Sequence, residues 1–321
     1  MKLHPLLLDD NISAALRVVQ HVSVCPSRRA LLDASGLLAI DPTAACLVAY
    51  AARLAQHTGK ELAIEDCTPT LKQIFDHMNC KLTYVPPSEP RDTKTHVPTL
   101  ALSVPSRDVA NSVANHISAR IAEFIPAEDR REMQDHYGCR IYHQIQPALA
   151  YVFSELVDNV FSHAQTVEFP DPMAWVAAKW YPAGDLVRVA VVDDGCGLLG
   201  SLRALTAPPR NHFEATAMAF RPRISSKSDR NLYTERSHLG LGLPICRDIC
   251  QRLGGRIYVA SGNALITDPG LERQENRRLD FAHQGTIVSL EFHRRAATTR
   301  TLPEILEKYR GSPDLRPRFD P

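Results

Sequence analysis

The chain has 321 residues, of which 44% are hydrophobic and 23% are charged. This composition is typical of a globular protein with about two domains, and it excludes a wholly disordered, collagen-like or disulfide-scaffold chain. The 37 Lys and Arg residues nearly balance the 36 Asp and Glu residues, so the net charge of +1 gives no overall attraction to nucleic acid or to a membrane surface.

Membrane-spanning and metal-binding patterns are not expected either. No apolar segment approaches the roughly 20 residues that span a bilayer. The apolar segment at Leu6–Leu8 is too short for a signal peptide. The sequence has 8 cysteines and no CxxC pair, so we expect reduced thiols, no zinc site and a cytoplasmic location.

The first 84 residues alternate predicted strands and helices. Asp41-Pro42 and Thr68-Pro69 each place a capping residue before a proline, which is typical of a helix N-terminus. Gly59 is expected to end the first of these helices. The alternation predicts a small α/β domain at residues 1–84, with helices at 11–21, 42–57 and 69–79 and strands at 30–33 and 61–64.

Residues 85–139 are predicted to connect this domain to a second one. Prolines at positions 86, 87, 90 and 98 lie among charged residues and indicate a linker. A short strand at 100–104 and a helix at 108–124 are expected to follow.

The second predicted domain covers residues 140–292. A polar segment at 198–239 divides it, and Gly254-Gly255 is expected to end the helix after that segment. The tail at 293–321 is expected to be loosely ordered apart from a short helix at 303–309. The pattern predicts a first helix at 140–164 and strands at 174–181, 186–192, 256–260 and 286–292.

The first of three motifs lies near the end of that first helix. Glu155, Asn159 and His163 are spaced i, i+4, i+8 and therefore form one polar stripe. An amide oxygen is a suitable Mg²⁺ ligand, and a carboxylate one turn away can orient or deprotonate an attacking hydroxyl. The alternative is a solvated polar face without chemistry.

The second motif directly follows an apolar strand. Asp193 stands at the end of the strand, and Gly195 and Gly197 come next. The glycines let the backbone approach a flat ligand while the acid accepts a hydrogen bond from it. The alternative is a tight turn after a strand, which is common.

The third motif opens a helix. Gly240 and Gly242 stand at its predicted start. Glycines there expose backbone N–H groups to an anion, and the helix dipole favours phosphate. Glycines that only make the turn are the alternative.

Together, in this order, the three motifs resemble the ATP-binding domain of gyrase-type ATPases, Hsp90-like chaperones, histidine kinases and MutL-type proteins, the GHKL superfamily. The N-box resembles Glu155–Ala164, the first glycine box Asp193–Gly197 and the second Gly240–Leu243, and Gly285-Thr286 fits the closing pair before the last strand. The resemblance covers Arg140–Phe292 and implies an α/β sandwich of Bergerat type, with a mixed sheet covered by helices on one face.

The resemblance also implies roles for single residues. Glu155 resembles the general base, Asn159 the Mg²⁺ ligand, and Asp193 the acid that binds the adenine amino group. Thr286 would support Asp193. The expected nucleotide contacts are Asn159, His163, Asp193, Gly195, Gly197, Lys227, Gly240, Leu241, Gly242, Leu243 and Thr286.

Residues 198–239 would form a lid over the triphosphate in this family. The segment is rich in Arg and Lys, an excess suited to phosphate. Ser237–Leu239 stand where many relatives have another glycine, so the resemblance leaves the lid geometry open.

The resemblance leaves the branch within the superfamily open. No phosphoacceptor histidine of histidine-kinase type precedes Glu155, since His143 carries no recognisable motif. His163-Ala164 is similar to the serine-kinase anti-sigma branch, whereas Asp158 is gyrase-like.

The N-terminal part weakly resembles the STAS domain of anti-sigma-factor antagonists. The strand, loop and Asp-capped helix of Leu31–Ala44 match that pattern. Pro42-Thr43 stands where those domains carry a hydroxyl pair that includes the phosphorylated residue, and Pro42 has no hydroxyl. An unrelated small α/β domain is the alternative.

These motifs predict a cytoplasmic regulatory protein that uses ATP and Mg²⁺. An intact Glu155 favours a protein kinase or a slow ATPase, and the alternative is a nucleotide-operated binding switch without turnover. The expected partners are a regulatory protein and a second copy of the chain, with no membrane or nucleic acid.

Overall fold

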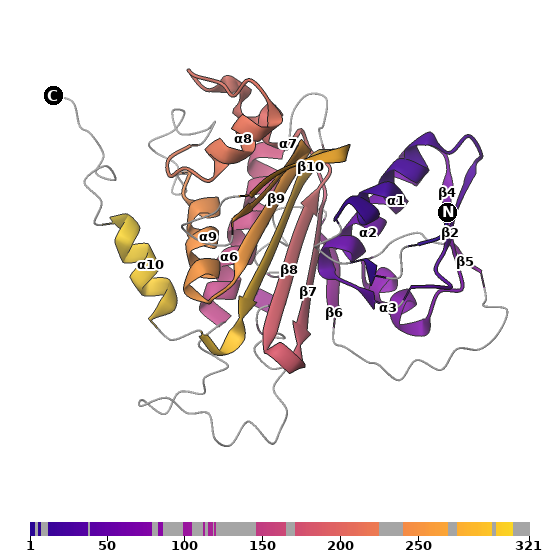
Figure 1. Ribbon diagram of the computed structural model, residues 1–321, viewed down its shortest axis with the longest axis horizontal. Coiled ribbons are helices and arrows are strands. Elements are labelled where there is room, and N and C mark those ends of the chain that lie inside the picture. Colours follow the sequence, from indigo (N-terminus) through magenta and orange to yellow (C-terminus); the bar gives the residue numbers. More distant parts are fainter. Residues whose placement is uncertain are drawn as a thin grey trace.

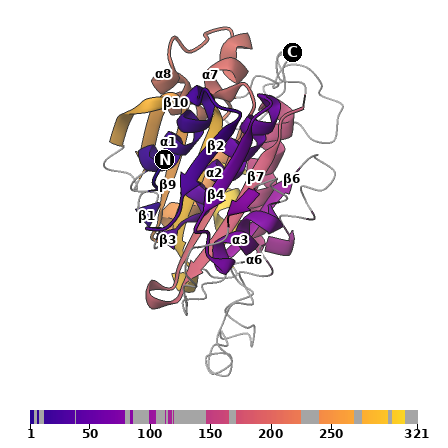
Figure 2. The ribbon, with the colours of Figure 1, turned by 90° about the vertical axis from the view of Figure 1, so that its right-hand side faces the viewer.

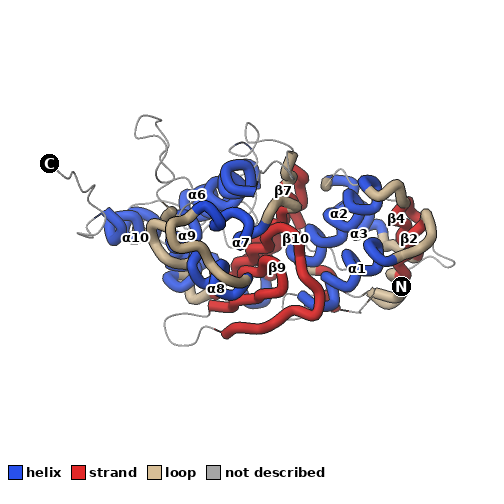
Figure 3. Tube along the Cα trace, turned by 90° about the horizontal axis from the view of Figure 1, so that it is seen from above, coloured by secondary structure: helices blue, strands red, loops and turns tan. Residues whose placement is uncertain are grey.

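The computed structural model has a central sheet with helices on both faces (Figure 1). Seen from above, strands β9 and β10 separate α6 and α9 on one side from α1 and α2 on the other (Figure 3). The structure describes residues 1–3, 6–7, 12–37, 39–78, 83–85, 99–104, 112, 115–117, 119, 146–164, 171–224, 240–268, 275–296 and 300–310.

The central sheet has five strands in the order β6-β7-β8-β10-β9. Every pairing in it is antiparallel. The predicted α/β sandwich is confirmed, but a mixed sheet was predicted and the pairings of the described strands in this sheet are all antiparallel. A short turn at Pro182–Gly184 makes this pairing between β7 and β8, while β6 with β7 and β8 with β10 pair across long connections. The strands are β6 (Thr99–Val104), β7 (Ala174–Tyr181), β8 (Leu186–Asp193), β9 (Arg256–Asp268) and β10 (Glu275–His293).

Alternate side chains of β8 enter two different cores. Val189 and Val191 join the core that contains α6 (Gln146–Asn159) and α9 (Gly242–Arg252). Ala190 and Val192 join the core that contains the N-terminal helices. A strand buried on both faces needs apolar residues at nearly every position, which explains the continuous apolar pattern of β7 and β8.

The N-terminal region is itself an α/β layer, as its alternation predicted. Its strands are parallel in the order β2-β4-β5, with β1 paired to β3. The elements are β1 (Leu6–Leu7), α1 (Ile12–Val24), β2 (Arg29–Asp33), β3 (Ala39–Ile40), α2 (Pro42–His57), β4 (Glu61–Glu65), α3 (Pro69–His77) and β5 (Thr83–Val85).

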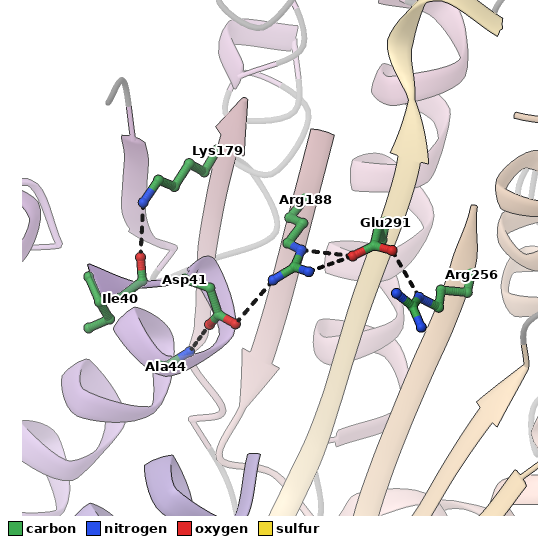
Figure 4. Close-up of polar contacts among 7 residues, drawn as sticks. All are labelled: Ile40, Asp41, Ala44, Lys179, Arg188, Arg256 and Glu291. Carbon is green, nitrogen blue, oxygen red and sulfur yellow. Dashed lines mark hydrogen bonds and ion pairs between the residues drawn. The ribbon is translucent and has the colours of Figure 1, made fainter. Parts of the chain in front are cut away.

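Helix α2 begins and ends where the sequence indicates. The Asp41 carboxylate accepts a hydrogen bond from the Ala44 N–H at 2.8 Å and caps the helix. Gly59 follows the helix with φ +67°, a conformation that glycine adopts without strain. The Lys179 ammonium of β7 donates to the Ile40 carbonyl at 3.1 Å, which ties the start of the helix to the sheet (Figure 4).

The N-terminal helices cover the second face of the central sheet, and the sequence did not indicate this (Figure 2). Helix α2 packs on β7 and β8, and α1 contacts β10. The prediction of helices on one face holds for α6 and α9, while the other face shares a core with α1 and α2.

A row of charged side chains joins α2 to the sheet on that second face (Figure 4). A guanidinium nitrogen of Arg188 lies 2.7 Å from a Glu291 oxygen and another lies 3.9 Å from an Asp41 oxygen. Arg256 pairs with the other Glu291 oxygen at 2.8 Å. Asp41 and Glu291 are buried and the Arg188 side chain is 12% exposed, so the opposite charges in this row stabilise each other.

The remaining helices lie in the C-terminal tail and in the predicted lid segment. The short helix predicted at 303–309 is confirmed as α10 (Thr301–Arg310), which packs on α9 and α6. The predicted lid segment begins with α7 (Gly197–Ser201), a short turn and α8 (His212–Ala219), and α8 contacts β9. Its residues 225–239 lie outside the described residues.

The division at residues 84, 139 and 292 stays a prediction. Strand β6, from the predicted connecting segment, pairs with β7 at the edge of the central sheet. The proline-rich residues 86–98 and most of the helix predicted at 108–124 lie outside the described residues. Every described helix lacks the length or the apolarity to cross a bilayer.

Candidate nucleotide site

The first motif lies where α6 changes its winding. The α-helix ends at Asn159 and continues as a π-helix at Val160–Ala164, so the helix end predicted at Ala164 is confirmed. Phe153 and Val157 are buried in the core, while Glu155 is only partly buried. Single π-helical turns are frequent at functional sites.

The second glycine motif contacts the first motif directly. Helix α9 begins at Gly242. A Cβ atom on Gly242 would lie 2.6 Å from Oε2 of Glu155 and 3.5 Å from Nδ2 of Asn159, so a side chain here would displace the Glu155 carboxylate. The backbone N–H groups in the first turn of α9 therefore lie beside an acid and an amide.

Glu155 occupies a low-dielectric position. Burial raises the pKa of its carboxyl group, and the hydroxyl of Tyr151, one turn earlier, donates a hydrogen bond that opposes this effect. The neighbouring Asp158 charge raises the pKa further. A carboxyl group with a raised pKa is a stronger base once ionised, which suits proton abstraction.

Asp193 lies at the end of β8 and is buried. Burial raises its pKa to about 7, although it accepts hydrogen bonds from the backbone N–H of Gly195 and from Thr286. Thr286 lies on β10 next to Ile287, the partner of Val192 in the pairing with β8. The structure thus brings Thr286 to Asp193.

The first glycine box packs against the π-helix. A side chain on Gly195 would clash with Ala164, and the Cys196 N–H donates to the Ala164 carbonyl at 3.1 Å. Gly197 has φ +67°, and a Cβ there would lie 2.7 Å from the Ser261 hydroxyl oxygen. Close contacts therefore disfavour a side chain at both glycines, and the positive φ of Gly197 favours glycine there as well.

Ser261 of β9 and His283 of β10 also contact this turn region, but no sequence motif marked them. The Ser261 hydroxyl accepts from the Leu198 N–H at 2.9 Å and donates to the Gly285 carbonyl at 3.0 Å. Nε2 of His283 lies 2.9 Å from the Asp193 carbonyl oxygen. Both residues lie inside long strands, where their side-chain types carry no local signal.

The remaining residues predicted to contact the nucleotide differ in burial and in their hydrogen-bond partners. Leu243 is buried, and Leu241 is partly buried, so their side chains pack and only their backbones are open to a ligand. Gly240 has φ +62°, and its carbonyl accepts from the Arg223 N–H at 3.0 Å. The His163 carbonyl accepts from the Cys196 thiol at 3.3 Å. Lys227 lies outside the described residues.

The two groups of residues are joined by one stretch of helix. Glu155, Asn159 and Gly242 meet at one end, and Ala164 contacts the Asp193–Gly197 turn at the other. About nine residues of helix separate Glu155 from Ala164, or roughly 13 Å at 1.5 Å per residue. This spacing suits an extended ligand with a flat group at one end and an anionic group at the other.

The described residues include no group of three or more His, Cys, Asp or Glu side chains that could hold a metal ion. Asn159 beside Glu155 supplies one amide oxygen, which suits Mg²⁺. A magnesium site that uses few protein ligands and the ligand's own phosphates is compatible with this arrangement. The role of Asn159 as a metal ligand stays a prediction.

Comparison with known proteins agrees with this geometry. Residues 144–296 match the family described as histidine kinase-, DNA gyrase B-, and HSP90-like ATPase. A search of curated proteins finds no match. The matched residues include all three motifs and four strands of the central sheet, β7 to β10.

The chain therefore contains a GHKL-type ATPase domain, and this domain supports ATP binding. The predicted domain at 140–292 has nearly the same bounds as the match. The match does not extend to the N-terminal region, whose STAS resemblance stays a prediction.

Proposed function

We propose that the protein is a regulatory protein that uses Mg-ATP as a protein kinase or as a slow ATPase. The observation that carries the proposal is the contact of Gly242, at the start of α9, with Glu155 and Asn159. A base and an amide beside a helix N-terminus form the set of groups that phosphoryl transfer needs.

The adenine end of the site has an acid in a close-fitting turn. Asp193 can accept a hydrogen bond from the exocyclic amino group, while Gly195 and Gly197 keep the turn free of side chains. Thr286 holds the Asp193 carboxylate in place. This end would therefore select adenine by its amino group.

At the phosphate end, backbone N–H groups of Gly240–Leu243 would bind phosphate oxygens. Bound Mg-ATP would supply the transferable phosphoryl group. Asn159 would hold the metal, and Glu155 would accept the proton of the attacking hydroxyl or water. His163 lies nearer the adenine end, where its carbonyl accepts from the Cys196 thiol. Lys227, in the lid segment, would add a positive charge near the phosphates.

The N-terminal region is proposed to dock partners and not to accept phosphate. Thr43, the remaining hydroxyl at the acceptor position of the STAS resemblance, is 2% exposed. It lies on α2, across the sheet from α6 and α9. Transfer from this site to another protein, or hydrolysis, is therefore favoured over transfer to Thr43.

A binding switch without turnover is the second candidate. The packing of α2 on β7 and β8 favours it, because nucleotide binding could change how that helix presents a partner surface. In either case we propose a cytoplasmic protein with a regulatory protein partner and a possible second copy of its own chain.

The test is incubation of the full chain with γ-labelled ATP and Mg²⁺, with and without candidate partner proteins. Label released as phosphate supports the ATPase, and label on a partner supports the kinase. Retention of all label in ATP, with ATP binding measured by calorimetry, supports the switch. Label on Thr43, located by mass spectrometry, would contradict the docking role.

A further inference from the structure

The two neighbouring acids at the end of β8, Asp193 and Asp194, point to opposite faces of the sheet. Asp193 follows the alternation of Val189 and Val191, which face α6 and α9. Asp194 faces the other way, and its Oδ2 lies 2.8 Å from Nε of Arg53 on α2. The N-terminal region therefore contacts the turn at Asp193 from the face of the sheet opposite to α6 and α9.

Arg53 joins both chain segments that flank this end of the sheet. Besides Asp194, its guanidinium donates to the Asp171 carbonyl at 3.2 Å and lies 3.6 Å from the Met173 sulfur. The Met173 N–H donates to Oδ1 of Asp194 at 2.7 Å. One side chain of α2 thus fixes the segment that enters β7 and the segment that leaves β8.

The ion pair is shielded from solvent. The side chain of Arg53 is 24% exposed and that of Asp194 is 14% exposed. Salt screens such a pair less than a surface pair, so it can hold a geometry. Both carboxylate oxygens of Asp194 have partners, which leaves the side chain little freedom.

Tyr50, three residues before Arg53 on the same face of α2, reaches the same turn. Its ring meets the His283 ring edge-on, with centroids 5.1 Å apart. Nε2 of His283 lies 2.9 Å from the Asp193 carbonyl oxygen. Burial lowers the pKa of His283 to about 4, so the ring is neutral at pH 7 and donates from Nε2 to that carbonyl.

We propose that Arg53 is a positioning residue of the nucleotide site, which holds the Asp193–Gly197 turn through Asp194 from the opposite face of the sheet. The proposal rests on the proposed binding of adenine at Asp193. It makes α2 part of the nucleotide site, although α2 lies outside residues 144–296. By linkage, ATP binding and the docking of α2 strengthen each other to the same degree.

The first experiment compares Arg53→Ala with the unsubstituted full chain. Calorimetry with Mg-ATP should show an affinity about tenfold lower, because the turn loses its support. Lys179→Met is the matched control. It removes the contact of Lys179 with Ile40 at the other end of α2 and should leave the affinity within about twofold. Circular dichroism confirms that both variants are folded at the temperature used.

A double-mutant cycle separates positioning from general loosening of α2. Asp194→Asn should weaken Mg-ATP binding by a similar factor, and adding Arg53→Ala to it should weaken binding by less than about twofold more. Arg53→Lys keeps the charge but lacks the guanidinium fork, so its affinity should lie between those of the Ala variant and the unsubstituted chain.

The outcomes that would overturn the proposal are distinct from those that test ATP binding itself. Equal affinity of the unsubstituted chain, Arg53→Lys and Asp194→Asn would overturn it, even if Arg53→Ala fails to fold. Additive losses in the cycle would overturn it as well. If the unsubstituted chain binds no ATP, the proposed function falls and this inference falls with it.

Discussion

The two faces of the central sheet are both buried, yet their charged groups have different partners. On the α2 face, the carboxylates of Asp41, Glu291 and Asp194 lie against guanidinium groups. On the α6 face, Glu155 and Asp193 accept hydrogen bonds from neutral hydroxyl and N–H groups, and burial raises the pKa of both.

The different partners indicate different roles for the buried carboxylates on the two faces. Burial raises the pKa of Asp194 as well, but the guanidinium of Arg53 opposes that shift and favours the charged carboxylate. A buried carboxylate that has only neutral donors keeps a pKa nearer to neutrality and can take up a proton or bind a new donor. The α2 face therefore joins two regions, and the α6 face carries the candidate site.

The largest effect is expected from Glu155→Gln. Turnover of Mg-ATP should fall by about two to four orders of magnitude, because the amide cannot accept the proton, while ATP affinity stays nearly unchanged. Phosphate release or transfer to a partner, measured beside calorimetric binding, gives both quantities. If the unsubstituted chain shows no turnover with any partner, the enzyme hypothesis is wrong and the switch remains.

Arg188→Met tests the opposite face. The substitution leaves the buried carboxylates of Asp41 and Glu291 without this guanidinium, so the free energy of unfolding should fall by about 3–5 kcal/mol. Urea denaturation followed by circular dichroism measures it.

Arg256→Met is the matched control for this prediction. Arg256 pairs with the same Glu291, but its side chain is 42% exposed, so its loss should cost under about 1 kcal/mol. Equal losses for the two variants would contradict the structural role of the buried row, and so would a loss of ATP affinity in folded Arg188→Met.

Asp193→Asn should weaken ATP binding by about 1–3 kcal/mol, because the amide can turn an N–H donor toward the adenine amino group. Calorimetry with Mg-ATP measures this. Asp248→Asn provides the control, since Asp248 is a buried acid on α9 that faces Lys308 and Tyr309 of α10. Its affinity for ATP should be unchanged, and identical affinities of the Asp193 variant and the unsubstituted chain would refute the adenine role.

The smallest effect is a pH dependence of adenine binding. Because burial raises the pKa of Asp193 to about 7, most of this acid is protonated at pH 6 and ionised at pH 8. The ionised form is the better acceptor, so affinity should rise by up to about tenfold across this interval.

Adenosine is the suitable probe for this dependence, because it has no phosphate that titrates in the same interval. The dependence should vanish in Asp193→Asn. A pH-independent affinity in the unsubstituted chain, or the same dependence in the variant, would show that another group is responsible.

Local features of the site could be predicted from the sequence, whereas its long-range partners could not. The spacing of Glu155 and Asn159 and the turn around Asp193 depend on neighbours in the chain, so the motifs indicated them. Arg53 and His283 reach the same turn from distant segments, and nothing near them in sequence marks the contact.

The same distinction applies to the fold. Caps, glycines and apolar periodicity determined the N-terminal α/β layer and the strands β7 and β8, because each depends on contacts over a few residues. The antiparallel order of the sheet and the packing of α2 on its second face were decided only by the tertiary structure. They depend on burial summed over segments far apart in the chain, and on charge pairs such as Arg188 with Asp41 that form only when those segments meet.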